Sequence, residues 1–136
     1  MKLYKSNTKI KVSFCDLDPL NIVWHGNYLK YLELARGEMF ESLGFGYEKM
    51  AENNLSYPIA KMDLKFIAPA TLNQELNVCC TLKEIEPAII IDYLITDINT
   101  NEKLFKATSM QICVHLASKE TLYTAPDVLK KRLENG

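Results

Sequence analysis

The order of the predicted elements most constrains what this chain can fold into. One long helix is predicted at residues 27–43, and the sequence after it consists mainly of strand-like runs. An apolar stripe runs along the helix at helical spacing: Tyr28, Leu32, Ala35, Met39 and Leu43. Three further apolar residues widen that face: Leu29, Leu34 and Phe40. Gly44 and Gly46 then supply a typical helix end.

Strand-like runs lie on both sides of the helix. Before it, Ile10, Val12 and Phe14 alternate with polar residues, as in a half-buried strand. Four runs follow it, at residues 60–66, 76–85, 88–97 and 103–116. In the last run the apolar residues of the alternation are Met110, Ile112, Val114 and Leu116. Two short helical segments complete the prediction, at residues 47–53 and 126–131.

The links between the later strands are short and rich in turn residues, as at Glu86-Pro87 and residues 97–101. Short links favour antiparallel neighbours. The predicted fold class is therefore α+β, with an antiparallel sheet packed on one helix. Because the helix is apolar across a wide arc, the sheet has to curl around it. The edges of such a sheet need a cover or a partner.

The composition is that of one soluble domain covering residues 1–136. Hydrophobic residues make up 48% of the chain and charged residues 24%, which is ordinary for a globular protein. A chain of 136 residues can bury a sizeable core. The net charge is −1, with acids and bases interspersed. This balance argues against a nucleic-acid-binding protein, which needs a basic face.

The cysteines and the N-terminus predict a cytoplasmic protein. The four cysteines have neither the C-x-x-C spacing nor the histidine partners of a zinc site, so we expect free thiols in a reducing compartment. The first residues, Met-Lys-Leu-Tyr-Lys-Ser-Asn, lack the apolar core of a signal peptide. No apolar run approaches the length of a membrane span.

The segment between the first strand and the long helix carries the residues best suited to chemistry. It reads Phe14-Cys-Asp-Leu-Asp-Pro-Leu-Asn-Ile-Val-Trp-His-Gly-Asn-Tyr28. Its two carboxylates, Asp16 and Asp18, are candidates for a nucleophile or a general base. The start of a helix supplies unpaired N–H groups and positive potential, which can stabilise a developing oxyanion.

The pattern D-x-D-P-x-x-I-V-W-x-x-N-Y in this segment resembles the active-site segment of hotdog-fold acyl-CoA thioesterases. The nearest groups are the 4-hydroxybenzoyl-CoA thioesterases and the short-chain acyl-CoA thioesterases associated with the bacterial Tol-Pal system. The resemblance implies a curved sheet wrapped around one central helix. It also implies hydrolysis of an acyl-CoA to a carboxylic acid and CoA without metal or cofactor. Homodimers or homotetramers are typical of the family.

The resemblance assigns roles to the charged residues of the segment. Asp18 aligns with the catalytic acid of the family, acting as nucleophile or as general base. Asp16 aligns with the first acid, for which we expect a structural role in fixing the loop. His25 stands where the Tol-Pal-associated group has a histidine and the 4-hydroxybenzoyl group a tyrosine, and we expect it either to donate a hydrogen bond to the thioester carbonyl or to adjust the local proton balance.

Four neighbouring residues are candidates for substrate binding. Gly26 lets a substrate approach the backbone closely, and the amides near it are candidate oxyanion donors. Asn27 is expected mainly to cap the helix and secondarily to contact substrate. Trp24 and Tyr28 are expected to line the acyl site.

The sequence departs from the family at one place in this loop. The common pattern has glycine three positions after the catalytic acid, where this chain has Asn21. Asparagine tolerates the left-handed conformation, so we expect the turn to be kept. Basic residues should also meet the phosphates of CoA. Five lysines are candidates, and the sequence does not choose among them: Lys61, Lys65, Lys83, Lys103 and Lys106.

Two alternatives stay open at the level of sequence. An acyl-carrier-protein thioesterase shares the fold and the chemistry, and a non-catalytic acyl-CoA-binding protein shares the fold alone. A hotdog dehydratase is disfavoured, because it needs a histidine paired with an acid on the central helix. The acids of that helix, Glu33, Glu38 and Glu41, have the spacing of a solvated face. Acyl chain length and aromatic or aliphatic preference are not predicted.

Overall fold

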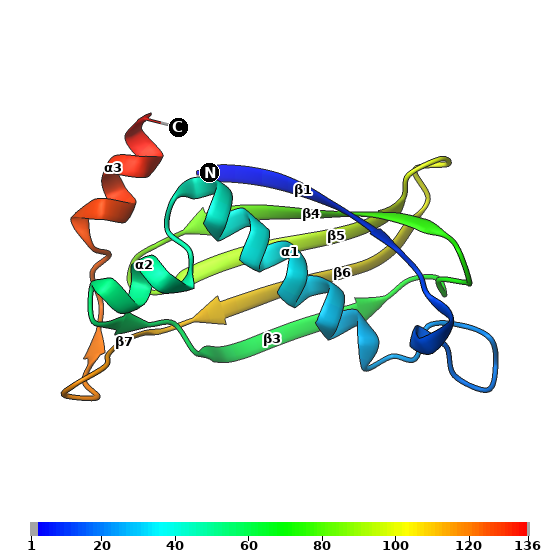
Figure 1. Cartoon of the computed structure of the whole chain (residues 1–136), viewed down its shortest axis with the longest axis horizontal. Coiled ribbons are helices and arrows are strands. Elements are labelled where there is room, and N and C mark those ends of the chain that lie inside the picture. Colours follow the sequence, from blue (N-terminus) through cyan, green and yellow to red (C-terminus); the bar gives the residue numbers. More distant parts are fainter. Residues whose placement is uncertain (1–2, 136) are drawn as a thin grey trace.

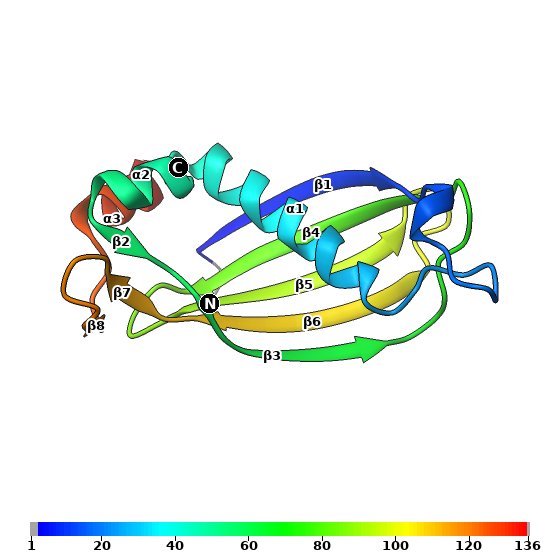
Figure 2. The same ribbon diagram turned by 60° about the horizontal axis from the view of Figure 1, so that its bottom comes forward.

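A curved five-stranded antiparallel sheet with one long helix lying across it forms the core of the molecule (Figures 1 and 2). The computed structural model describes residues 3–135. The helix is α1 (Asn27–Leu43), which has the predicted bounds. The strands of the sheet, in spatial order, are β1 (Tyr4–Lys11), β4 (Glu75–Glu84), β5 (Ile89–Asp97), β6 (Lys103–Gln111) and β3 (Ile59–Phe66). The predicted fold is confirmed.

The remaining elements lie at the two ends of this core. A short 3₁₀ helix, η1 (Phe14–Asp16), and the loop after it lie near the start of α1, at the right of Figure 1. The other end holds α2 (Tyr47–Glu52) and α3 (Asp127–Asn135). A small sheet of β2 (Leu55–Ser56), β7 (Cys113–His115) and β8 (Thr121–Leu122) lies with them.

Helix α1 buries the predicted stripe against the sheet. The five stripe residues and Phe40 are at most 4% exposed. Leu29 and Leu34, which we expected to widen the apolar face, remain 39% and 54% exposed. The sheet therefore covers one side of the helix and leaves the opposite side open. Gly44 ends the helix with φ +80°, the left-handed conformation that glycine adopts without strain. Within residues 3–135, no helix is long and apolar enough to cross a bilayer.

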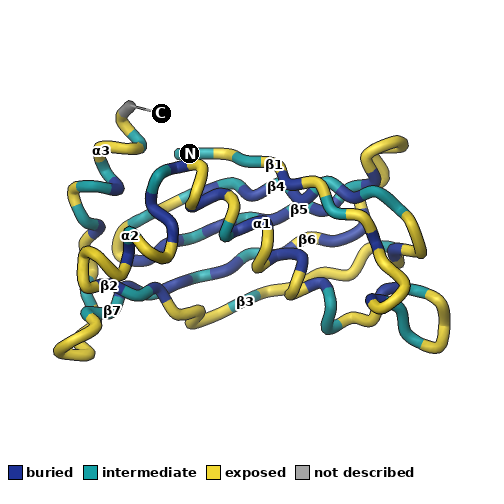
Figure 3. Tube along the Cα trace, in the orientation of Figure 1, coloured by how far each residue is buried: buried dark blue, intermediate teal, exposed yellow. Residues whose placement is uncertain are grey.

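Strand β3 forms one edge of the sheet and is the most exposed of its strands (Figure 3). It pairs with β6 on one side only. Seven of its eight residues are exposed, and only Met62 is half-buried. The expected strand is present, and in the isolated chain both of its faces are largely exposed.

Two other details differ from the prediction. Strand β1 ends at Lys11, and Phe14 lies in η1 with 79% of its surface exposed, so it does not extend the buried strand. The predicted run 103–116 is two strands, because β6 ends at Gln111 and β7 begins at Cys113. From residue 109 to residue 116, where the alternation was read, the buried residues are Ser109, Gln111 and Cys113, which belong to the opposite phase from the apolar residues.

Candidate active site

The loop between η1 and α1 is held against the connection from β3 to β4. The Val23 amide donates to the Ala70 carbonyl at 2.9 Å, and Ile22 forms an isolated bridge with Thr71. A tight turn forms the tip of the loop, where the Asn21 amide donates to the Asp18 carbonyl at 2.9 Å. Asn21 has φ +64°, so it keeps the left-handed turn as expected.

Asp16 anchors the start of this loop. Its carboxylate is buried and accepts hydrogen bonds from the Tyr31 hydroxyl at 2.8 Å and from the Ser13 amide and hydroxyl at 3.1 Å each. It also forms an ion pair with Lys30. Burial alone would raise the pKa of Asp16, but the hydrogen bonds from Lys30, Tyr31 and Ser13 outweigh it and lower the pKa to about 2. Asp16 therefore has the structural contacts that we expected.

The first residues of α1 are arranged differently from the prediction. The N-cap position is Gly26, without a side-chain cap, so the expected capping role of Asn27 is wrong. The Asn27 side-chain amide instead donates to the Asp16 carbonyl at 2.8 Å and ties the helix to the loop. A Cβ on Gly26 would lie 2.2 Å from the Trp24 ring, so any other residue there would make this ring move from its present position.

Asp18, His25 and Tyr28 are brought together in one pocket of about 290 Å³. The Asp18 carboxylate accepts a hydrogen bond from the Leu20 amide at 2.8 Å and is half-buried. The rest of the lining is apolar: Ile22, Val23, Phe66, Ile67, Ala68 and Pro69. Trp24, Gly26 and Asn27 are not among the lining residues, although they flank His25 and Tyr28 in the chain.

Two backbone amides without a backbone acceptor lie at the start of α1, beside this pocket. Among residues 3–135, no backbone carbonyl accepts from the amides of His25 and Gly26, whereas the Asn27 amide donates to the Trp24 carbonyl at 2.8 Å. The helix macrodipole adds positive potential at the same end. The pocket thus combines a carboxylate, an imidazole and an apolar wall, and the two amides lie at the helix start beside it.

The wall contributed by β3 was missed in the sequence. Residues 66–69, Phe-Ile-Ala-Pro, form an apolar run at the end of the alternating strand. Such a run could have indicated a segment that lines a pocket. Its position opposite Asp18 depends on β3 lying at the edge of the sheet, beside β6. Periodicity alone does not predict that spatial order. The Lys30 and Tyr31 contacts to Asp16 were missed as well, because both residues read as ordinary helix positions.

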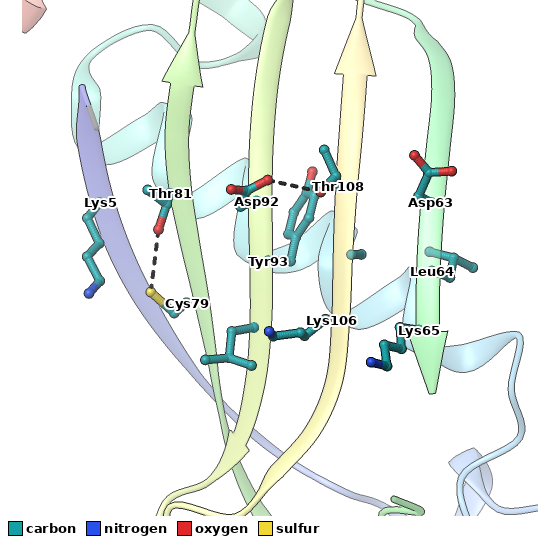
Figure 4. A pocket seen from close by; sticks show the side chains of 12 residues that line it. Lys5, Asp63, Leu64, Lys65, Cys79, Thr81, Asp92, Tyr93, Lys106 and Thr108 are labelled. Atoms are coloured by element: carbon teal, nitrogen blue, oxygen red, sulfur yellow. Dashed lines mark hydrogen bonds between the residues drawn. The ribbon is translucent and has the colours of Figure 1, made fainter. Parts of the chain in front are cut away.

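A larger hollow, of about 460 Å³, lies on the face of the sheet that points away from α1 (Figure 4). Lys65 and Lys106, two of the five candidate lysines, line it from neighbouring strands. Asp63 and Asp92 line it as well, and Asp92 accepts a hydrogen bond from Thr108 at 2.9 Å. None of the residues of the D-x-D segment reaches this hollow. Asp18, His25 and Tyr28 all line the other pocket.

Comparisons with known proteins agree with this fold. YneP of Bacillus subtilis is 26% identical over 113 residues, which cover 82% of this chain and 81% of YneP. The acyl-CoA thioesterase YbgC of Helicobacter pylori is 32% identical over 84 residues, which cover 61% of this chain and 60% of YbgC. The solved structure of Slr0204, a 1,4-dihydroxy-2-naphthoyl-CoA thioesterase from Synechocystis, superposes with a TM-score of 0.87 at 17% identity and covers 97% of both chains.

The family assignment rests on nearly the whole chain. Residues 12–133 match the family model of the Thioesterase-like superfamily. The matched range includes the D-x-D segment, α1 and every strand of the large sheet except β1. From its fold, its site and this match, the chain belongs to the Thioesterase-like superfamily and has the hotdog fold.

Proposed function

We propose that this protein is an acyl-CoA thioesterase that hydrolyses an acyl-CoA to a carboxylic acid and CoA, with Asp18 as the nucleophile or general base. The observation that carries the proposal is the convergence of Asp18, His25 and an apolar wall in one pocket at the start of α1. The family match and the activity for which the Helicobacter pylori relative is named support the same reaction.

The pocket offers a place for each part of the thioester. The acyl group lies against the apolar wall of Val23, Phe66 and Ile67. The carbonyl oxygen points to the His25 and Gly26 amides, which have no backbone acceptor among residues 3–135. There the amides and the helix dipole stabilise negative charge as it develops on that oxygen. His25 lines the pocket and donates a further hydrogen bond to the same oxygen.

Asp18 acts by one of two balanced routes. In the first, its carboxylate attacks the carbonyl carbon, the C–S bond breaks, and water then hydrolyses the acyl-aspartate anhydride. In the second, the carboxylate removes a proton from water as the water attacks the same carbon. Both routes release CoA as a thiolate, which then takes up a proton, and both restore Asp18.

The test is release of free CoA thiol from a panel of acyl-CoAs by the wild type and by Asp18→Asn. We expect the variant to lose about 10²- to 10⁴-fold in kcat, because the amide is neither a nucleophile nor a base. Asp127→Asn, an exposed acid on α3, is the matched control and should keep wild-type activity. Near-normal turnover by folded Asp18→Asn, or no turnover of any acyl-CoA by the wild type, would reject the proposal.

A further inference from the structure

We propose that the hollow on the outer face of the sheet binds a phosphorylated sugar, such as the ribose phosphate of a nucleotide. This face points away from α1, and the hollow of about 460 Å³ is in the usual range for small-molecule sites (Figure 4). The residues that carry the proposal are Lys65 of β3, Lys106 of β6 and Asp92 of β5. The inference does not depend on the proposed thioesterase function, because the hollow and the pocket at Asp18 share no lining residue.

Two lysines lie directly opposite each other at one end of the hollow. Lys65 and Lys106 are partners in the antiparallel register of β3 and β6, and both are exposed. Like charges directly across two strands repel each other and destabilise the sheet. Among residues 3–135 neither lysine forms an ion pair, whereas Lys61, farther along β3, pairs with Asp63 at 3.7 Å. An anion bound between the two ammonium groups would remove this repulsion.

A phosphate monoester suits this pair of lysines better than a carboxylate. It carries about two negative charges at neutral pH and offers three acceptor oxygens. A lysine ammonium is a point charge with three donors, so two of them can bind one phosphate from two sides. Both side chains extend from their strands toward β5 in Figure 4. Lys5 of β1 lines the opposite side of the hollow and adds a third positive charge.

Polar groups beside the two lysines suit the hydroxyls of a sugar. Asp92 and Thr108 are partners across β5 and β6, and Thr108 lies two residues along β6 from Lys106. Two residues of an extended strand span about 7 Å, so a sugar whose phosphate lies between the lysines can place its hydroxyls over Asp92. Thr108 donates to Oδ1 of Asp92 at 2.9 Å, and the carboxylate has further lone pairs for a ligand hydroxyl.

The experiment titrates the protein calorimetrically with ribose 5-phosphate, AMP, inorganic phosphate and adenosine. We expect ribose 5-phosphate and AMP to bind with a Kd of about 1 mM or lower, phosphate to bind more weakly, and adenosine, which lacks the phosphate, not to bind. Lys65→Gln and Lys106→Gln should each raise the Kd of AMP roughly threefold to tenfold, and the double variant should abolish binding. Lys103→Gln is the matched control, because Lys103 is an exposed lysine of β6 that does not line the hollow.

Asp92→Ala tests the contact with the sugar separately. The substitution removes a negative charge near the lysines, so inorganic phosphate should bind roughly twofold more tightly. Ribose 5-phosphate should instead bind more weakly, because its hydroxyls lose their acceptor. Lys65 and Lys106 are exposed and Asp92 is half-buried, so all these variants are expected to fold. Equal changes in the affinity for the two ligands would overturn the assignment of a phosphorylated sugar.

A ribose phosphate can reach this hollow as a free nucleotide or as part of CoA, and a kinetic measurement distinguishes the two sources. A KM for acyl-CoA that rises in Lys106→Gln at unchanged kcat would assign the hollow to CoA, whereas an unchanged KM with AMP binding lost would assign it to a free nucleotide. Failure of every phosphorylated probe to bind the wild type, or binding that survives in the double lysine variant, would overturn the proposal. A lower mass of the lysine variants in sedimentation, without probe binding by the wild type, would instead place a second copy on this face.

Discussion

At the scale of single residues, the two acids of the D-x-D segment occupy opposite environments although one residue separates them. The Asp16 carboxylate is buried and saturated by donors from Ser13, Tyr31 and Lys30. The Asp18 carboxylate lines the pocket and accepts from a single backbone amide, that of Leu20. A carboxylate that is already saturated is a poor base, whereas one with free lone pairs can meet water or substrate. Asp16 is therefore suited to hold the loop in place, and Asp18 is suited to react.

Asp16→Asn should destabilise the fold by about 2 kcal/mol at neutral pH. The pKa of Asp16 lies well below that of an unfolded aspartate, at about 2, so the ionised form stabilises the native state. The unfolded chain binds the proton more readily, so this contribution is full above about pH 5 and is lost as the pH falls toward 2. Urea unfolding of wild type and variant at several pH values measures both effects.

Glu102→Gln, an exposed acid in the turn between β5 and β6, serves as the control and should change the unfolding free energy by less than about 0.5 kcal/mol. The difference between wild type and Asp16→Asn should shrink as the pH is lowered from 5 to 2. If that difference stayed constant over this range, the anchoring role of the ionised carboxylate would be wrong.

At the scale of elements, prediction succeeded where apolar periodicity and burial agree. Helix α1 has the predicted bounds, since its stripe faces the sheet and Gly44 ends it. Strands β4 and β5 start and end within one residue of the prediction, because both are central strands with an alternating buried face. The turn between these two strands was also predicted, from Glu86-Pro87.

Prediction failed where buried positions are occupied by polar residues, and where contacts between distant elements determine which residues line the site. In β6 the buried Ser109 hydroxyl is hydrogen-bonded to the Tyr93 hydroxyl at 2.7 Å, and the Gln111 side-chain amide donates to the Tyr57 carbonyl at 2.7 Å. Such partners make a polar buried face stable, so the apolar residues indicated the wrong phase. In the site, Asp18, His25 and Tyr28 were found from one motif. Phe66 and its neighbours were missed because the order of the strands brings them there.

The turn at Asn21 provides a test at this scale. Asn21→Gly should keep stability and activity, because glycine adopts the observed φ of +64° without strain. Asn21→Val should cost about 1–2 kcal/mol, because a branched side chain opposes the left-handed conformation, and it should lower kcat by moving Asp18. Thermal unfolding and thiol-release assays on both variants check this. Equal stability of the glycine and valine variants would contradict it.

At the scale of the whole molecule, β3 is an edge that the single chain leaves uncovered. Three of its large apolar residues, Ile59, Leu64 and Phe66, are 38%, 39% and 52% exposed, and Ile67 just beyond it is 43% exposed. Unpaired strand edges template pairing with another chain. We therefore expect a homo-oligomer in which β3 pairs with β3 of a second copy. The pocket at Asp18 lies beside the same strand, so assembly and activity should be linked.

The charges of β3 predict the register of that pairing. In an antiparallel two-fold pair, residue i faces residue j and residue j faces residue i. Pairing centred on Met62 places Lys61 of each copy opposite Asp63 of the partner subunit, and opposite charges directly across strands are stabilising. Within one chain the two side chains are already close, at 3.7 Å, and both are largely exposed. In the pair centred on Met62, each Lys61 and each Asp63 therefore faces a residue of opposite charge.

Charge reversal tests both the assembly and the register. Lys61→Asp places like charges opposite each other across the edge and should shift the protein toward monomer, whereas the double swap Lys61→Asp with Asp63→Lys restores opposite charges and should recover the oligomer. Sedimentation at several concentrations measures the masses, and Tyr123→Asp, an exposed residue beyond β8, is the control. A monomeric wild type would refute the edge pairing. A double swap as weak as the single variant would refute only the register centred on Met62.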